Sequence, residues 1–416
     1  MERRIAITGY GALCSLDTKA DSLWEKVCQG QTAIRKIENF DVSEFRTQIG
    51  GEIPSLEWVN VSQYVQQRDI KKLDNSSIFG LIAAKDALDM AAIPEGYYEP
   101  YRCGTFVGSG IGGLLTLELQ HKRLLASGPS KVSPFTIPKF IPNLVCGNIS
   151  INFKLRGPSF AAVSACASAN HSIGCAMDYI RLNRCDMVVC GAAEAALTPV
   201  AYAGFGAMRA MSERNDDPAH ASRPFDTQRD GFVMSEGAGI LILEEMESAK
   251  RRGAKIYAEL IGYGASSDAE HITHPNANGE GGAKSMEMAL WEAKLNPEQI
   301  DYINVHGTST PSGDIAEIKG IKSLFQDHAY KIPISSTKSE VGHMLGASGS
   351  VEMIFCVKTI ETGVVAPTIN VFEQDPECDL NIVPNKAQEH KVDIAMSNNF
   401  GFGGHNSTLI VKRYTN

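Results

Sequence analysis

The residues best suited to carry chemistry are one cysteine and two histidines that lie far apart in the chain. Cys166 stands in the run Ser-Ala-Cys-Ala-Ser, where small neighbours would let a substrate approach the sulfur closely. The pattern predicts a buried strand over residues 161–165 that ends at Cys166, with a helix directly after it. A thiol at a helix N-terminus lies in the positive end of the helix dipole, which favours the thiolate. Cys166 is therefore a candidate nucleophile, with a buried structural cysteine as the alternative.

The two histidines each follow a predicted strand. His306 follows the strand predicted over residues 302–305 and opens the run His-Gly-Thr-Ser-Thr-Pro, and His343 follows the strand predicted over residues 332–336. Ligands of open α/β sheets gather outside the carboxyl ends of strands, so Cys166 and both histidines can meet at one mouth. A glycine-rich turn over residues 399–404 could aim a backbone N–H at a developing oxyanion.

The elements that must position these residues form an alternating pattern. Apolar runs of strand length alternate with runs of helical periodicity, which predicts an α/β fold. The predicted strands cover residues 5–8, 104–108, 161–165, 187–190, 240–244, 302–305, 332–336, 394–397 and 408–412.

The tetrapeptide Gly-Tyr-Gly-Ala occurs at residues 9–12 and again at 262–265, each time after an apolar strand. The same order of strand and helix follows both copies, which indicates an internal duplication. We therefore divide the chain into halves at residues 1–252 and 253–416. The first half is longer, and its extra material is expected to build a lid or a dimer surface.

Composition excludes several classes of protein. The 416 residues are 43% hydrophobic and 21% charged, which is typical of a globular chain and not of a disordered one. The net charge of −9 makes a nucleic-acid partner unfavourable. The ten cysteines include no C-x-x-C pair, which favours a reducing compartment. We expect no signal segment, because the first residues already read as a strand. The longest weakly charged stretch, residues 187–208, is interrupted by Glu194 and Pro199, so we expect a cytoplasmic protein with no membrane contact.

Several other motifs resemble nucleotide, phosphate or metal sites but are incomplete. Residues 108–113 satisfy G-x-G-x-x-G after a strand, but the acidic residue of a dinucleotide site is missing about 20 positions on, so a glycine turn lining another pocket is favoured. Residues 279–285 lack the first glycine of a P-loop. His271 and His274 lack a carboxylate partner, which indicates a solvated loop rather than a metal site. We interpret His171 as a histidine packed on the helix after Cys166. We expect neither a metal nor a bound nucleotide.

Taken together, the motifs resemble those of the β-ketoacyl-[acyl-carrier-protein] synthases, specifically the elongating type II condensing enzymes. The resemblance is nearly full length and includes the motifs at residues 164–168, 191–194, 222–226, 229–232, 306–311, 336–339, 342–343 and 400–404. It implies the α/β thiolase fold, with five layers α-β-α-β-α built from two duplicated halves, and a homodimer. It also implies that substrates arrive on the phosphopantetheine of an acyl carrier protein, without a separate cofactor.

The resemblance implies a role for each catalytic residue. Cys166 would take an acyl chain from a carrier-protein thioester, and His306 and His343 would assist decarboxylation of malonyl-carrier protein and stabilise the enolate. An imidazole Nε–H that donates to the thioester oxygen stabilises negative charge as it forms. Lys338 would be an electrostatic organiser paired with Glu352.

Further roles follow from the same resemblance. The N–H groups of Cys166 and Phe402 would form an oxyanion hole, and Phe402 with Phe400 would gate the entry of malonyl groups. Ile111 would close the acyl tunnel at the dimer contact, which fits an elongating enzyme of broad range. Thr308 and Thr310 would bind pantetheine, and the candidates for the carrier-protein surface are Arg68, Lys71, Lys72, Lys131 and Arg209.

The chain departs from the family pattern at two positions. Asn399 replaces the usual serine before the first phenylalanine, and His405 replaces the usual threonine after Gly-Gly. We expect His405 to point away from the pocket. Two alternatives stay open: a ketosynthase of a polyketide or aryl-polyene pathway, and a non-catalytic carrier-binding subunit. The presence of Cys166 argues against the second.

Overall fold

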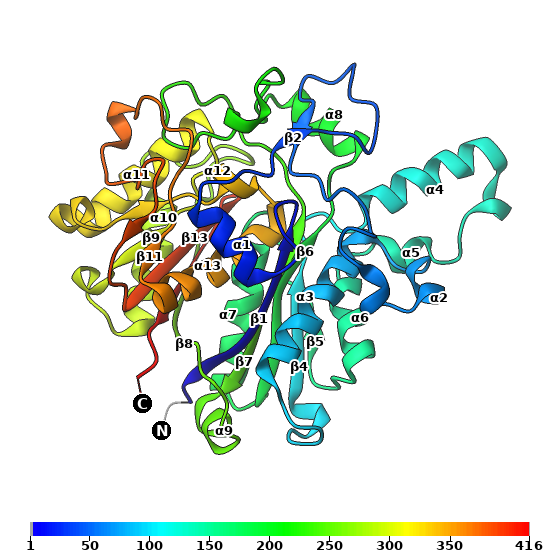
Figure 1. The fold of residues 1–416 in the computed structure, drawn as a ribbon, viewed down its shortest axis with the longest axis horizontal. Coiled ribbons are helices and arrows are strands. Elements are labelled where there is room, and N and C mark those ends of the chain that lie inside the picture. The colour runs from blue at the N-terminus through cyan, green and yellow to red at the C-terminus, as the bar shows by residue number, and fades with distance from the viewer. Residues whose placement is uncertain (1–2, 416) are drawn as a thin grey trace.

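A ten-stranded mixed β-sheet runs through the computed structural model, which describes residues 3–415 (Figure 1). Its strand order is β10-β9-β13-β14-β8-β1-β7-β6-β4-β5. At the centre, β1 (Ile5–Cys14) pairs antiparallel with β8 (Ala258–Ser267) through three residue pairs, which join two segments of five strands. The first segment is β1-β7-β6-β4-β5 and the second is β8-β14-β13-β9-β10.

The other elements are distributed as follows. The N-terminal part contains α1 (Ala20–Cys28), β2 (Arg35–Lys36), β3 (Ile49–Gly50), α2 (Gln67–Ile70), α3 (Asn75–Ala91), β4 (Cys103–Gly108), α4 (Leu114–Ser127), α5 (Thr136–Phe140), α6 (Leu144–Phe153), β5 (Ser159–Phe160), α7 (Ser168–Arg181), β6 (Met187–Glu194), α8 (Pro199–Ala207), β7 (Gly237–Glu245) and α9 (Met246–Arg251). The C-terminal part contains α10 (Glu280–Ala293), β9 (Tyr302–Asn304), α11 (Pro311–Phe325), β10 (Ile334–Ser335), α12 (Lys338–Val341), α13 (Ser348–Thr362), β11 (Val364–Val365), β12 (Gln388–Glu389), β13 (Ile394–Gly401) and β14 (His405–Lys412).

The two sheet segments enclose a central pair of helices. Helices α7 and α13 pack against each other, with α7 on β4 and β6 and α13 on β7 and β13. Helix α3 covers the outer face of the first segment, and α10 covers the outer face of the second. The layers are therefore helix, sheet, helix, sheet and helix, which is the thiolase-like α/β architecture expected from the resemblance.

The repeated tetrapeptide has the same structural reason in both copies. In β1, a Cβ on Gly11 would lie well inside van der Waals contact with the carbonyl oxygen of Ala83 on α3. In β8, a Cβ on Gly264 would meet the carbonyl oxygen of Ser285 on α10 in the same way. Only glycine lets strand and helix approach this closely. Both copies also continue in equivalent order, β1–α3–β4 and β8–α10–β9.

The extra material of the first half lies between β1 and β4, between β4 and β5, and between β6 and β7. The part between β4 and β5 contains α4, α5 and α6. Helix α4 projects from the body of the molecule beside α5 (Figure 1). This region exposes large apolar side chains, among them Leu119, Leu125, Ile137 and Ile151. Strand β5 is the open edge of the sheet on the same side. An exposed apolar surface next to a free strand edge is typical of a protein interface.

One predicted strand is wrong. Residues 161–165 are an irregular loop, and the strand before Cys166 is limited to residues 159–160. The small Ala and Ser residues of this run have little preference for a strand. The chain must also turn sharply into α7, which it does with Ala165 at φ 50°. The other predicted strands overlap observed strands.

Within residues 3–415, every helix is too short or too polar to cross a bilayer.

Candidate active site

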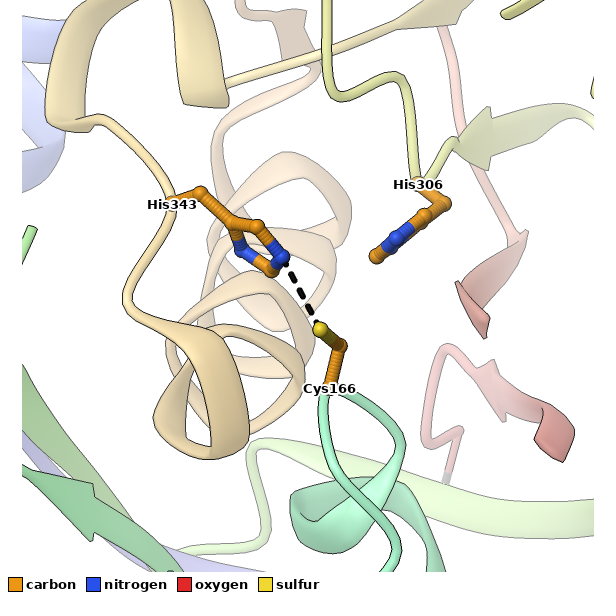
Figure 2. Close-up of side chains that lie close together, drawn as sticks. All are labelled: Cys166, His306 and His343. Atoms are coloured by element: carbon orange, nitrogen blue, oxygen red, sulfur yellow. Dashed lines mark hydrogen bonds between the residues drawn. The ribbon is translucent and has the colours of Figure 1, made fainter. Parts of the chain in front are cut away.

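The side chains of Cys166, His306 and His343 lie close together and point toward one another (Figure 2). One side-chain donor atom from each lies within 4.8 Å of those of the other two. The Nε2 atom of His343 is 3.1 Å from the Sγ atom of Cys166. The two imidazole rings have centroids 5.4 Å apart and stand nearly perpendicular. Sulfur and imidazole suit either nucleophilic catalysis or a soft metal ion.

A tight turn presents Cys166 to the cavity. The hydroxyl of Ser168 donates to the carbonyl of Ala165 at 2.7 Å and accepts from the N–H of Ser164 at 2.8 Å. These bonds hold the left-handed backbone of Ala165, a conformation that costs free energy in a residue other than glycine. The sulfur is thereby fixed two residues before α7 begins.

His343 is held by a segment from the first part of the chain. Its N–H donates to the carbonyl of Val233 at 2.8 Å, and its carbonyl accepts from the N–H of Ser235 at 2.9 Å. Its ring atom Nδ1 lies 3.0 Å from the hydroxyl of Ser348, the first residue of α13. The backbone and the far ring nitrogen are both anchored, so Nε2 is directed at Cys166.

His306 is held by a buried carboxylate. The N–H groups of His306 and Gly307 donate to the two oxygens of Glu317 at 2.9 and 2.8 Å. Glu317 lies on α11, and burial raises its pKa to about 7. The short loop after β9 is therefore fixed to α11, and the His306 ring stands at the cavity wall.

Burial controls the charge states at the site. It raises the pKa of the Cys166 thiol to about 12, although the nearby Lys338 lowers it. Burial therefore opposes the thiolate that the helix N-terminus favours. Burial and then Lys338 lower the pKa of both His306 and His343 well below its ordinary value. Burial thus favours the neutral forms of the thiol and of both imidazoles.

Lys338 and Glu352 form a buried ion pair behind the histidines. Their side chains are each 1% exposed, and the Lys338 Nζ donates to the Glu352 Oε1. The lysine is fixed by this carboxylate, and its positive field reaches both histidines and Cys166. A group so enclosed acts through its charge rather than by contact with a substrate.

The three residues line a cavity of about 840 Å³. The residues expected at the pocket also line it, namely Ile111, Thr308, Thr310, Phe400 and Phe402. Ile111 packs against an apolar cluster that contains Tyr202 and Leu345. The hydroxyls of Thr308 and Thr310 lie 3.1 Å apart on the cavity wall. A cavity of this size can hold a medium-sized acyl group.

The glycine turn folds back over Cys166. A Cβ on Gly401 would lie 3.1 Å from the N atom of Cys166, so the two backbones approach closely. Within the described chain, neither the N–H of Cys166 nor that of Phe402 donates to another protein group. The Phe402 ring lies 6.2 Å from that of Phe205, and the Phe400 ring lies 5.7 Å from that of His306. The turn therefore lies directly against the backbone that carries the sulfur.

The candidates for the carrier-protein surface, apart from Arg209, lie outside the cavity. Arg68, Lys71, Lys72 and Lys131 are exposed on the surface, whereas the exposed Arg209 also stands at the cavity wall. Arg68 and Lys72 both approach the carboxylate of Asp69. His405 is exposed, and its ring lies against Gly403 rather than in the cavity lining.

Sequence reasoning missed the role of Glu194. Its buried carboxylate accepts from the hydroxyl of Ser109 at 2.8 Å and from the N–H of Gly110 at 2.6 Å. It also accepts from the N–H of Gly346, 3.1 Å away in the second half. This carboxylate fills the G-x-G-x-x-G turn, so the N–H groups that would hold a phosphate are already occupied. An acidic residue at the end of a buried strand was the available signal.

Comparisons with known proteins place the chain among condensing enzymes. The sequence model "Beta-ketoacyl synthase, N-terminal domain" matches residues 2–249, and "Beta-ketoacyl synthase, C-terminal domain" matches residues 257–372. A 3-oxoacyl-[acyl-carrier-protein] synthase 2 of Synechocystis sp. is 44% identical over 99% of both chains. The protein of the same name from Staphylococcus aureus is 43% identical, again over 99% of both chains.

Solved structures agree with this placement. A β-ketoacyl synthase from Burkholderia phymatum superposes over the full length of both chains with a TM-score of 0.92 and 34% identity. A type II polyketide ketosynthase, solved with its acyl-carrier protein and bound to a hexaketide, superposes with a TM-score of 0.92 and 30% identity, also over both full chains.

Proposed function

Because the chain belongs to the β-ketoacyl synthase family, we propose that it is a 3-oxoacyl-[acyl-carrier-protein] synthase of the elongating type. It extends an acyl chain on Cys166 by two carbons in a decarboxylative condensation with malonyl-carrier protein. The observation that carries this proposal is the Cys166 thiol hydrogen-bonded to His343 beside His306, in one cavity. The 44% identity to a 3-oxoacyl synthase over 99% of the chain supports the substrate class.

The first step loads the acyl chain. The Cys166 sulfur attacks the acyl thioester, and its proton passes to His343 Nε2, 3.1 Å away. The carrier-protein thiolate leaves and takes up that proton. Because the thiol pKa is raised to about 12, this base is required at neutral pH. The backbone N–H groups of Cys166 and Phe402 stabilise the oxyanion of the tetrahedral intermediate.

The second step forms the carbon–carbon bond. The malonyl carboxylate leaves as carbon dioxide, and the electron pair of the broken bond forms an enolate whose charge lies on the thioester oxygen. The neutral imidazoles of His343 and His306 face that oxygen, and the Lys338 charge favours the anion. The enolate carbon attacks the acyl carbon, and the Cys166 sulfur leaves as a thiolate. The product stays on the carrier protein.

The cavity wall accounts for the other proposed roles. Thr308 and Thr310 hold the pantetheine arm, and Ile111 limits the depth of the acyl tunnel. Phe402 and Phe400 separate the thiol from the entrance and gate the second substrate. Because the proposed oxyanion donor is the backbone N–H of Phe402, it would move together with the gating side chain of the same residue.

The partners follow from surface chemistry. An acidic acyl carrier protein docks on exposed cations of a chain whose net charge is −9. The proposed docking residues are Arg68, Lys71, Lys72, Lys131 and Arg209. The exposed apolar side chains of α4 to α6 and the open edge of β5 support a homodimer. The division of the chain into halves at residues 1–252 and 253–416 stays a prediction. A cytoplasmic location also stays a prediction.

Intact-protein mass spectrometry tests the proposal. The protein is mixed with myristoyl- or palmitoleoyl-carrier protein, with Cys166→Ala as the control. We expect a gain of one acyl group, absent in the variant and discharged by malonyl-carrier protein with release of a ketoacyl product. Acylation without discharge would contradict the condensation. If acyl chains of several lengths were tested and none formed an adduct, the result would favour the non-catalytic carrier-binding subunit.

A polyketide ketosynthase is the second candidate, favoured by the superposition on a solved type II polyketide enzyme. It would use the same three residues and differ in its tunnel. Discharge of saturated and unsaturated acyl-Cys166 alike supports fatty acid elongation, whereas turnover limited to polyketone chains supports this candidate.

A further inference from the structure

Glu194 ends β6 and is a buried carboxylate that the proposed reaction leaves unused. It is 0% exposed. Its Oε1 atom accepts from the hydroxyl of Ser109 at 2.8 Å and from the N–H of Ile111 at 3.3 Å. Its Oε2 atom accepts from the N–H of Gly110 at 2.6 Å and from the N–H of Gly346 at 3.1 Å. Because a carboxylate has about four lone-pair sites, these donors use all of its acceptor capacity.

The donors come from two segments that lie far apart in the sequence. Residues 109–111 follow β4 in the N-terminal part, whereas Gly346 lies in the 3₁₀ turn Leu345–Ala347 of the C-terminal part. The two segments touch, because a Cβ on Gly346 would lie 2.3 Å from the N atom of Gly110. Only glycine permits so close an approach of two backbones. Glu194 therefore joins the two segments at the point where their backbones are in contact.

The first segment carries Ile111, the proposed limit of the acyl tunnel. Ile111 lines the cavity and packs, like Cys166, against the apolar cluster that contains Leu345. Its backbone N–H is one of the donors to Glu194. The depth of the tunnel is therefore set by a turn whose position depends on this carboxylate.

The second segment connects His343 to α13. Gly346 lies between His343 and Ser348, whose hydroxyl is 3.0 Å from the Nδ1 atom of His343 and so helps to direct Nε2 at the thiol. Leu345 has a φ of 45°, a left-handed conformation that a residue other than glycine keeps only when surrounding contacts hold it. The bond from Gly346 to Glu194 is one of those contacts. A shift of Gly346 would therefore move the anchor of the histidine ring.

We propose that Glu194 is a positioning residue that fixes the tunnel end at Ile111 and the thiol base His343 relative to each other. The inference rests on the proposed condensing function, because that function gives both residues their roles. Glu194 acts only through the two backbone turns and touches neither the substrate nor the reacting atoms. Its loss should change two properties together, namely the upper limit of acyl-chain length and the reactivity of Cys166.

Two substitutions and one control test the assignment in the full-length protein. Glu194→Gln keeps the size of the side chain but turns an amide N–H₂ toward some of the donors, which then lose their acceptor. Ser109→Ala removes the hydroxyl donor of the tunnel turn and leaves the bond to Gly346. Glu245→Gln is the matched control, because Glu245 also ends a buried strand, β7, and accepts from two backbone N–H groups of α9.

The first readout is the rate at which iodoacetamide alkylates Cys166 at pH 7, followed by peptide mass spectrometry. This small reagent does not need the acyl tunnel, so the rate reports the action of His343. His343→Ala gives the rate without the base. Glu194→Gln should lower the rate about tenfold, towards that of His343→Ala. Ser109→Ala and Glu245→Gln should stay within about threefold of the wild-type rate.

The second readout is the dependence of Cys166 acylation on chain length, measured with carrier proteins that bear octanoyl to stearoyl chains. A looser turn at Ile111 admits longer chains. The ratio of the stearoyl rate to the octanoyl rate should therefore rise about fivefold in Glu194→Gln and in Ser109→Ala. The ratio should not change in Glu245→Gln. Because both rates belong to one variant, a general loss of activity or of folded protein cancels in the ratio.

Circular dichroism establishes that each variant is folded. Both changes in Glu194→Gln support the proposal, and either readout left at the wild-type value in the folded variant overturns it. If Glu194→Gln does not fold, Glu194→Asp takes its place, because its shorter carboxylate keeps the charge and cannot reach both segments. The same two changes are then expected, and their absence overturns the proposal. A wild-type protein that takes up no acyl chain contradicts the proposed function instead, and the alkylation rates still decide whether Glu194 positions His343.

Discussion

The N-termini of α7 and α13 occupy equivalent places in the two halves, yet they carry different chemistry. Before α7 the chain turns through Ala165 at φ 50° and presents the sulfur of Cys166 two residues ahead of the helix. Before α13 a 3₁₀ turn over Leu345–Ala347 separates His343 from the helix. The duplicated scaffold sets two helix ends side by side, and the lead-in to each helix decides which group reaches the cavity.

Substitution of Cys166 should remove the chemistry of the residue before α7 and leave that of His343 before α13 intact. Cys166→Ser keeps the shape of the side chain and a contact with His343, but its hydroxyl is a weaker nucleophile and a poorer leaving group. Condensation should fall at least about 1,000-fold. Malonyl-carrier-protein decarboxylation should persist, because both histidines remain. Radiolabelled product assays check the first effect and carbon dioxide release the second; full condensation by the variant would contradict the assignment.

A second prediction tests whether the two halves pack equivalently. Gly11→Ala and Gly264→Ala each place a Cβ against a helix carbonyl, at Ala83 and Ser285 respectively. Each should lower the free energy of unfolding by about 3 kcal/mol. Thermal denaturation measures both. Gly204→Ala on α8 is the matched control, because a Cβ there meets no atom within 4 Å. A large loss in one half only would show that the packing is unequal.

A third prediction separates the histidines. His343→Ala should slow acylation of Cys166 about 100-fold at pH 7, since it removes the base for the thiol. Because the thiol pKa is about 12, the variant should regain about tenfold in rate per pH unit as the pH rises. His306→Ala should leave acylation within about threefold, since it makes no bond to the sulfur. Time-resolved mass spectrometry measures all three, and equal losses would remove the distinction.

The smallest predicted effect concerns the surface. All proposed carrier-protein contacts lie in the first half. Arg209→Glu at the cavity mouth should raise the KM for acyl-carrier protein about fivefold at low salt, and less at high salt. Lys391→Glu, which changes an exposed lysine of the second half, should not alter the KM. Steady-state kinetics at two ionic strengths decide between them; an equal effect of both would point to net charge alone.

The sequence predicted the features that depend on neighbouring residues. The α/β class and most strands follow from apolar periodicity, and the repeated tetrapeptide revealed the duplication. The motifs selected Cys166, His306 and His343, which the structure brings within 4.8 Å. The predictions failed where contacts between distant segments determine the local structure. The predicted strand over residues 161–165 gave way to the turn into α7.

Contacts between distant segments also explain what was missed. The thiol pKa is set by burial, which no local pattern reports. Glu194 fills a turn 84 residues away, and Asn399 reaches a carboxylate 47 residues away. Such pairs are visible in three dimensions and have no local sequence pattern of their own.

The short ladder between β1 and β8 has a consequence for unfolding. Two family sequence models divide the chain, but the sheet is continuous through Ile5–Leu260, Ala6–Glu259 and Ile7–Ala258. The central helices α7 and α13 are also covered by strands from both parts. Neither part can lose its structure without exposing the apolar interior of the other. Heat should therefore melt residues 3–415 in one cooperative transition rather than two.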